Sequence, residues 1–367
     1  MGGKPVTSRC GLASNEHKED TMLNPKENYL MALRGEQPEY VPLSSPMVDG
    51  GPPPTMMLAP PLLHPERDPN GPGTNLLGVR FVHTDSTGGA GMPANDAFVL
   101  PLDDISNWGD YVKLPDFSDV DWEPLIAEQI RNMNINREDS SITFDIHMGY
   151  FQLLMALMGF EAGMIALYEC PDEVKEILEY ISSWYIDVAQ KTVDIYKPEI
   201  ITLCDDTAAW HAPFISPEFF REFFMPHHDK LAKLGRDRGL LLQIHCCGRT
   251  EDFIPLYLEM GLHGWSAAQT CNNLPKVKAT YGNAMTIMGG WDGRERLLDP
   301  LQSPENPNGV TEEELRQSVR DAMDSLAPGG GYVFGGGFMM AIGDTATPKK
   351  NEIIRDEAIK YSLDFYK

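Results

Sequence analysis

The sequence predicts a closed (β/α)8 TIM barrel with an irregular N-terminal extension, and three observations point to it. From residue 40 onward about eight strand-like segments follow one another, with helix-like segments between most of them. The later strand-like segments are continuous apolar runs, which suit strands buried on both faces of a parallel sheet. Eight strands that alternate with helices close most economically into a barrel. An open doubly wound sheet is the alternative architecture.

The chain is expected to consist of a tail and one domain. Residues 1–22 are polar and without periodicity, which predicts a disordered tail, and residues 23–367 are expected to form a single barrel domain. The eight expected strands cover residues 40–43, 79–82, 141–147, 199–205, 239–247, 262–268, 285–291 and 331–336.

Helical periodicity and capping residues define the segments between these strands. In residues 171–196 the apolar side chains recur at a spacing of about 3.6 residues, and Pro171 occupies the first turn, where proline is favoured. Ser216 is a typical N-cap for the helix that follows it. The expected helices cover residues 24–34, 122–133, 149–164, 171–196, 216–237, 311–326 and 349–366.

A long region rich in proline and glycine, residues 49–103, precedes the regular part of the chain. Only its residues 79–82 are strand-like. Irregular stretches of this length in a compact domain are usually functional or cover a site. A surface excursion packed by its own methionine and leucine side chains is the alternative.

Composition excludes several classes of function. The chain has 30 basic and 54 acidic side chains and a net charge of −24, which disfavours binding to nucleic acid or to anionic membrane surfaces. It lacks the apolar run of about 18 residues that a membrane span requires. Six cysteines are too few for a disulfide scaffold and the N-terminus does not resemble a signal peptide, so we expect a cytoplasmic protein with free thiols.

The stretch QIHCC contains the clearest candidate site. Side chains alternate along a strand, so His245 and Cys247 point to one side and Cys246 to the other. Because the strand ends here, the pair is expected at the C-terminal rim of the barrel, where barrel enzymes keep their active sites. Imidazole nitrogen and thiolate sulfur are usual zinc ligands, and a catalytic zinc has three protein ligands and one open position.

Four further residues at or after strand ends could supply the third ligand: Cys271, Asp292, Asp205 and Asp206. A packed thiol and capping or turn carboxylates are the alternatives for these residues. Asp145 and His147 share a face of their strand, and Asp205 and Asp206 end another, so proton transfer or helix capping are both open for them. His227 and His228, in the middle of a helix, are expected to have a solvated or hydrogen-bonded surface role.

Several stretches together resemble the uroporphyrinogen decarboxylase superfamily and, more closely, its corrinoid-dependent methyltransferase branch. The resemblance spans about residue 24 to the C-terminus and implies a (β/α)8 barrel. It rests on the order of the stretches KENYLMALRGEQPEYVPL, DDISNWGDYVKLPDFSDVDW, ISPEFFREFFMPHHDKL, QIHCCGRTEDFIPLYLEMGLHGW, IMGGWDGRERL and GGYVFGGGF.

The chain departs from the family pattern in two places. Decarboxylases of this family carry an R-Q-A-G-R-Y stretch that grips a substrate with eight carboxylates, whereas SSPMVDGGPPPTMM at the corresponding place contains no arginine. Together with the net charge of −24, this disfavours porphyrinogen decarboxylation. In the methyltransferases a later cysteine completes the zinc site begun by the H-x-C pair, and Phe338 stands at that position here.

The resemblance implies a methyltransferase that moves a methyl group between a methoxylated or methylated small molecule and a corrinoid protein, assisted by zinc. The corrinoid would come from a partner protein, because no D-x-H-x-x-G segment occurs in the chain. Trp210, Trp265 and Trp291 are expected to form an apolar wall for the substrate. Asp205, Asp206 and His147 are the candidates for proton transfer. A decarboxylase-type lyase and a catalytically silent binding protein are the alternatives, and the oligomeric state is open, with a homodimer as one option.

Overall fold

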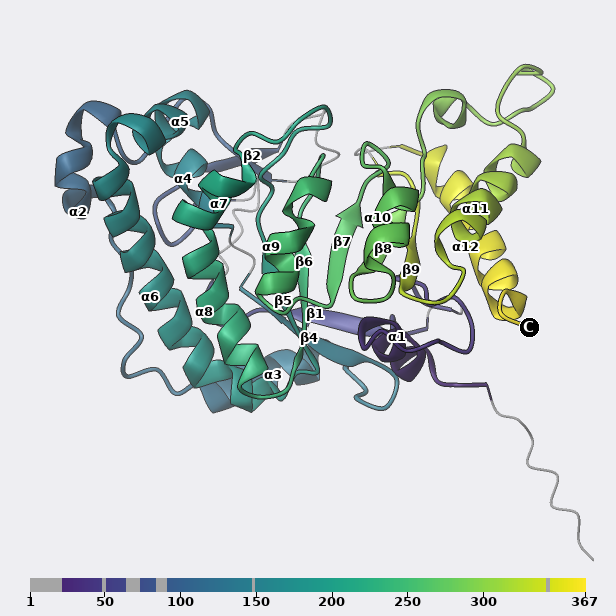
Figure 1. Cartoon of the computed structure of the whole chain (residues 1–367), viewed down its shortest axis with the longest axis horizontal. Coiled ribbons are helices and arrows are strands. Elements are labelled where there is room, and N and C mark those ends of the chain that lie inside the picture. The colour runs from purple at the N-terminus through teal and green to yellow at the C-terminus, as the bar shows by residue number, and fades with distance from the viewer. Residues whose placement is uncertain (1–21, 48–50, 64–72, 84–90, 147–148, 341–343) are drawn as a thin grey trace, which may run out of the picture.

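The fold is built on one curled sheet of seven parallel strands, in the order β1-β4-β5-β6-β7-β8-β9 (Figure 1). The structure, a computed structural model, describes residues 22–47, 51–63, 73–83, 91–146, 149–340 and 344–367. The strands of this sheet are β1 (Thr55–Leu58), β4 (Ser141–Asp145), β5 (Ile200–Cys204), β6 (Leu241–His245), β7 (Gly264–Ala268), β8 (Thr286–Gly290) and β9 (Tyr332–Gly335).

An eighth parallel position lies beside β9. Leu43 forms a parallel bridge with Phe334, supported by a hydrogen bond of 2.9 Å from Ser44 N to Phe334 O. Between this segment and β1 no strand pairing joins the described residues, so the barrel has an open seam there. The α/β, TIM-barrel-like fold predicted from the sequence is therefore confirmed, with this seam as a local departure.

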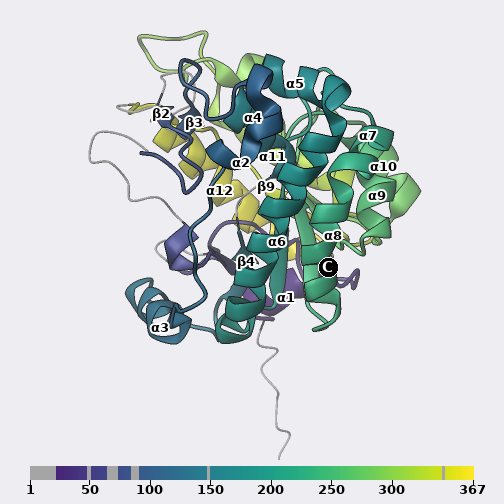
Figure 2. The same ribbon diagram turned by 90° about the vertical axis from the view of Figure 1, so that its left-hand side faces the viewer.

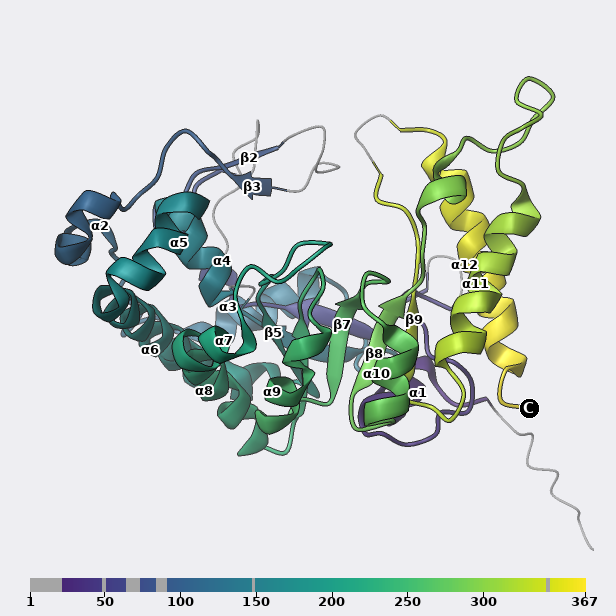
Figure 3. The same ribbon diagram turned by 45° about the horizontal axis from the view of Figure 1, so that its top comes forward.

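Two strands differ from their predicted places. β1 lies within residues 49–103, which we expected to be irregular. Its four residues are flanked by prolines, and so short a segment shows no strand pattern. Strand-like residues 79–82 do not join the barrel. They contribute instead to β2 (Phe81–His83), which pairs antiparallel with β3 (Gly91–Pro93) in a hairpin apart from the main sheet (Figure 3).

Helices cover the outside of the sheet (Figures 1 and 2). Two expected helices are broken in two: Gly159, at φ +85°, separates α4 from α5, and Pro226 follows the break between α7 and α8. The helices are α1 (Pro25–Leu33), α2 (Trp108–Tyr111), α3 (Trp122–Asn132), α4 (Tyr150–Met158), α5 (Phe160–Glu169), α6 (Pro171–Tyr196), α7 (Pro217–Phe223), α8 (Met225–Arg236), α9 (Ile254–Glu259), α10 (Leu274–Tyr281), α11 (Glu312–Leu326) and α12 (Thr347–Asp364).

Among the described residues, no single helix has both the length and the apolar character needed to cross a membrane. The consecutive helices α4 and α5 meet that criterion together, by length and composition only, and are bent by 109°. The predicted tail falls outside the described residues except for Met22, and the single domain over 23–367 stays a prediction.

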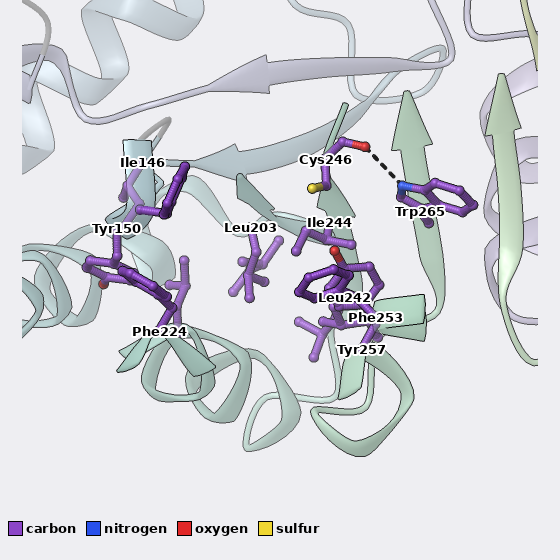
Figure 4. Close-up of a cluster of buried hydrophobic side chains, with 14 of the residues drawn as sticks. Ile146, Tyr150, Leu203, Phe224, Leu242, Ile244, Cys246, Phe253, Tyr257 and Trp265 are labelled. Carbon is purple, nitrogen blue, oxygen red and sulfur yellow. Dashed lines mark hydrogen bonds between the residues drawn. The ribbon is translucent and has the colours of Figure 1, made fainter. Parts of the chain in front are cut away.

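Side-chain alternation on β6 separates the core from the barrel interior. Leu242, Ile244 and Cys246 are fully buried and pack outward in a cluster with Phe253 and Tyr257 (Figure 4). The residues between them point to the opposite side of the strand, into the barrel. The apolar outer face thus orients the candidate ligands of the inner face.

Helix α1 closes the amino-terminal end of the barrel. The residues in contact are Tyr29, Leu30 and Leu33 of α1 with Ile200, Met288 and Val333 of the strands. Gly264 makes room for this helix, because a Cβ at that position would lie 2.7 Å from Leu33 Cδ2. Thr286 Oγ1 also donates to Ala32 O at 2.7 Å. A ligand therefore reaches the strands from their carboxyl ends.

We expect Leu33→Ala to lower the free energy of unfolding by about 2–5 kcal/mol, because it leaves a cavity under the packed barrel. Urea denaturation measures this loss. Glu27→Gln, on the exposed side of the same helix, is the control and should change stability by less than about 0.5 kcal/mol. Equal losses in both variants would contradict the closing role of Leu33.

Candidate metal centre

Three potential metal ligands meet at the carboxyl ends of β5 and β6. They are Asp206, His245 and Cys247, and their ligand atoms all lie within 4.8 Å of one another. His245 Nε2 and Cys247 Sγ are 3.5 Å apart. All three side chains are partly buried, so the group is sheltered but not sealed. This is the end of the strands at which α/β barrels bind substrates.

The register of β5 and β6 brings the three residues together. Cys204 pairs with His245, so the residues that follow each strand leave the sheet side by side. Cys247 N then donates to Asp206 Oδ1 at 2.7 Å. The next residue, Gly248, has φ +84° and lies so close to Ala208 that a Cβ would be 2.5 Å from its carbonyl oxygen. Only glycine fits this turn without strain.

Neighbouring side chains orient two of the ligands. Ser266 Oγ lies 3.3 Å from His245 Nδ1. When Ser266 Oγ accepts a hydrogen bond from Nδ1–H, the Nε2 lone pair of His245 faces the ligand group and can bind a metal. Gln152 Nε2, on α4, donates to Asp206 Oδ2 at 3.1 Å. The contacts from Gln152 and from the Cys247 amide fix both oxygens of the Asp206 carboxylate.

The donor set fits zinc. Nitrogen, sulfur and carboxylate oxygen are its ordinary ligands, at about 2.0–2.1 Å for nitrogen and about 2.3 Å for sulfur, which in a tetrahedron separates those two atoms by about 3.6 Å. The separation of 3.5 Å between His245 Nε2 and Cys247 Sγ agrees with this value. Burial, followed by the Asp206 charge, raises the pKa of Cys247 to about 12, so its thiolate needs a cation beside it.

Asp205 points away from the three ligands. Its carboxylate is fully buried and accepts hydrogen bonds from Phe151 N at 3.0 Å and Gln152 N at 3.1 Å, at the start of α4. His228 Nε2 lies 2.9 Å from its Oδ2. Asp205 therefore contacts protein groups and lies out of reach of a substrate, unlike its neighbour Asp206.

Cys271 and Asp292 do not belong to the ligand group found among the described residues. Asp292 is exposed and forms a bidentate ion pair with Arg294, with an Nη2–Oδ2 distance of 2.7 Å, which lowers the pKa of its carboxyl group. Cys271 Sγ accepts a hydrogen bond of 3.5 Å from Asn272 Nδ2. Asp206 is thus the third ligand that the geometry offers.

The three tryptophans lie in different environments. Trp265 is fully buried in the core and donates from Nε1 to Cys246 O at 3.1 Å, so it cannot line a substrate pocket (Figure 4). Trp210 lies beneath the Arg294 guanidinium, 4.1 Å from the ring centroid. Trp291 packs edge-on against Phe338, with 5.1 Å between ring centroids. Trp210 and Trp291 are both partly buried in loops after strands, which leaves them compatible with a substrate wall.

Comparison with known proteins places this chain in a family. The sequence model of the family described as Uroporphyrinogen decarboxylase (URO-D) matches residues 101–348. The chain belongs to the uroporphyrinogen decarboxylase family. A comparison with curated proteins found no match. A solved structure of a methyltransferase from Methanosarcina mazei shares 16% sequence identity, covers 94% of this chain and 100% of its own, and has a TM-score of 0.55, which shows a common fold.

Two histidines of α8 are buried, contrary to the prediction. The expected surface role of His227 and His228 was wrong, because their exposed fractions are 6% and 2%. His227 Nδ1 lies 2.8 Å from Ser182 Oγ, within the helix layer. Their spacing to Leu231, at three and four residues, places them on the apolar face of α8 and could have revealed this. His147, a candidate for proton transfer, lies outside the described residues.

Burial gives His227 an effect on stability that depends on pH. Burial lowers the pKa of His227 to about 4, whereas in the unfolded chain it is about 6.5. The unfolded state therefore binds a proton first, and the stability present above pH 6.5 falls as the pH decreases toward 4.

We expect the free energy of unfolding of the wild type to fall by up to about 3 kcal/mol across this interval because of His227. His227→Asn cannot titrate and should lack this loss. Urea denaturation at pH 7, 6 and 5 measures the slope, and comparing slopes removes any constant packing cost of the substitution. An unchanged slope in the variant would show that other groups cause the acid sensitivity.

Proposed function

We propose that this protein is a metal-assisted methyltransferase that moves a methyl group between a methoxylated or methylated small molecule and a corrinoid protein. The observation that carries the proposal is the group of Asp206, His245 and Cys247 at the carboxyl ends of the strands. The fold shared with a methyltransferase is consistent with it. The absence of arginine from SSPMVDGGPPPTMM argues against a porphyrinogen substrate.

Zinc is the metal that these ligands suit. Asp206, His245 and Cys247 would hold it with a fourth position open, and Asp206 would replace the cysteine that is absent at residue 338. Zinc bound there would supply Lewis acidity, which polarises a substrate oxygen or stabilises a thiolate. The hydrogen bonds from Gln152 and from the Cys247 amide hold Asp206 in place for this role.

The leaving oxygen or nitrogen of a methyl donor needs a proton or a positive charge beside it. Asp206 would be engaged as a metal ligand, and Asp205 is buried against α4. The predicted role of His147 in proton transfer therefore remains part of the proposal. The cytoplasmic location also stays a prediction.

The carboxyl face of the barrel is the docking surface that we propose for the corrinoid protein. Three aromatic side chains are exposed there by 47%, 49% and 37%: Phe98, Phe160 and Phe214. Phe160 and Phe214 contact each other, with 5.8 Å from Phe214 and 6.4 Å from Phe160 to the Phe151 ring below. An exposed apolar group of this kind suits a protein partner.

We expect His245→Ala and Cys247→Ala each to weaken zinc binding by more than about 100-fold and to abolish methyl transfer, because each removes a ligand. Zinc content and competition with a chelator measure binding, and transfer is followed with a purified corrinoid protein. Cys271→Ala is the matched control. The Cys271 thiol lies outside the ligand group, so this variant should bind zinc as the wild type does. Undiminished transfer in the first two variants would refute the proposal.

Asp206→Asn is expected to weaken zinc binding by about 10- to 100-fold, because a neutral amide oxygen replaces a charged ligand. Asp292→Asn is its control, an exposed aspartate paired with Arg294. Chelator competition at a fixed pH distinguishes the two. Equal affinities in both variants would remove Asp206 from the ligand set.

A decarboxylase-type lyase is the second candidate, favoured by the family to which the chain belongs. Turnover of a porphyrinogen without any corrinoid protein would establish it. A catalytically silent binding protein would show neither bound metal nor turnover of either kind.

A further inference from the structure

The buried pair of Asp205 and His228 lies next to the metal ligands but is not one of them. Their side chains are 0% and 3% exposed, and His228 Nε2 is 2.9 Å from Asp205 Oδ2. With the amides of Phe151 and Gln152 this gives the carboxylate three partners. A buried carboxylate at a helix N-terminus is strongly favoured when donors surround it in this way.

His228 is held in one position by aromatic side chains. Its ring stacks on Phe220, at 5.7 Å between centroids and an interplanar angle of 17°. Tyr150 meets the same ring edge-on at 4.9 Å. Both aromatic residues lie on helices that pack outside the sheet, so helix packing sets where the imidazole donates.

Two short paths lead from Asp205 to the metal ligands. Along the backbone, Asp205 N donates to His245 O at 3.0 Å. Through α4, Asp205 holds the amide of Gln152, and Gln152 Nε2 donates to Asp206 Oδ2 at 3.1 Å. The start of α4 lies so close to Asp205 that only glycine fits at residue 149, where a Cβ would lie 2.2 Å from Asp205 Oδ1.

We propose that His228 is a positioning residue for the metal centre. It fixes the Asp205 carboxylate, Asp205 fixes the start of α4, and Gln152 at that start orients Asp206 for the metal. The proposal rests on the metal site of the proposed function but not on methyl transfer. Residues that orient metal ligands typically contribute about 10- to 100-fold to metal affinity.

Replacing His228 by phenylalanine tests this role, because the ring can still pack on Phe220 while the donor to Asp205 is lost. We expect His228→Phe to weaken zinc binding by about tenfold in chelator competition. We also expect a changed visible absorption spectrum when cobalt(II) replaces zinc, since that spectrum reports ligand geometry. His228→Gln, whose amide nitrogen can reach the place of Nε2, should restore both.

His227→Phe is the matched control. It removes a buried imidazole from the neighbouring position of the same helix, but that imidazole contacts Ser182 and not Asp205. Its zinc affinity and cobalt spectrum should match those of the wild type even if its stability falls. Gln152→Leu, at an exposed position, removes the hydrogen bond to Asp206 and should lower zinc affinity as His228→Phe does.

Three outcomes would overturn the proposal. Equal zinc affinity and cobalt spectra in His228→Phe and wild type would remove His228 from the centre while leaving the proposed metal site intact. Equal losses in His227→Phe and His228→Phe would show a general effect of disturbing α8. Failure of the wild type itself to bind zinc or cobalt would remove the metal site and the positioning role together.

Discussion

The parallel register of β5 and β6 is the constraint on which the candidate metal centre depends. Because Cys204 pairs with His245, Asp206 and Cys247 leave the sheet side by side and are joined by a hydrogen bond of 2.7 Å. A slip of one residue would turn the imidazole and the thiol toward the helices. The outward side chains of β6 are fully buried, so such a slip would expose the core. Apolar packing outside the barrel thus determines which groups face one another inside it.

The alternation of side chains along a strand was sufficient to predict that His245 and Cys247 point the same way. The third ligand could not be selected in this manner, because residues after a strand follow the path of a loop, which has no simple period. Cys271 and Asp292 have ligand atoms of the right chemical type, yet neither belongs to the group found among the described residues, and Asp292 is paired with Arg294. Asp206 stays close because it is only the second residue after β5, the strand that pairs with β6.

Much of the fold follows from the sequence, since strands and helices alternate clearly beyond residue 121. The first part of the barrel does not, because a four-residue strand among prolines has too few side chains to show a period. The burial of His227 and His228 was missed for a different reason. A polar residue on the apolar face of a helix is buried at low cost only when it has hydrogen-bond partners. Here the partners are Ser182 of α6 and Asp205, which follows β5, and the sequence of α8 does not reveal them.

Helix α1, which closes the amino-terminal end of the barrel, restricts the direction from which ligands reach the ligand group. With α1 packed against the amino-terminal ends of the strands, the ligand group is approached from their carboxyl ends. In the proposed reaction a small molecule and a corrinoid protein would both approach from that end, and the docked protein would cover it. The small molecule would then bind before the protein docks and leave after the protein has dissociated. Closure of the amino-terminal end by α1 would in this way determine the order in which the two ligands bind at the carboxyl end.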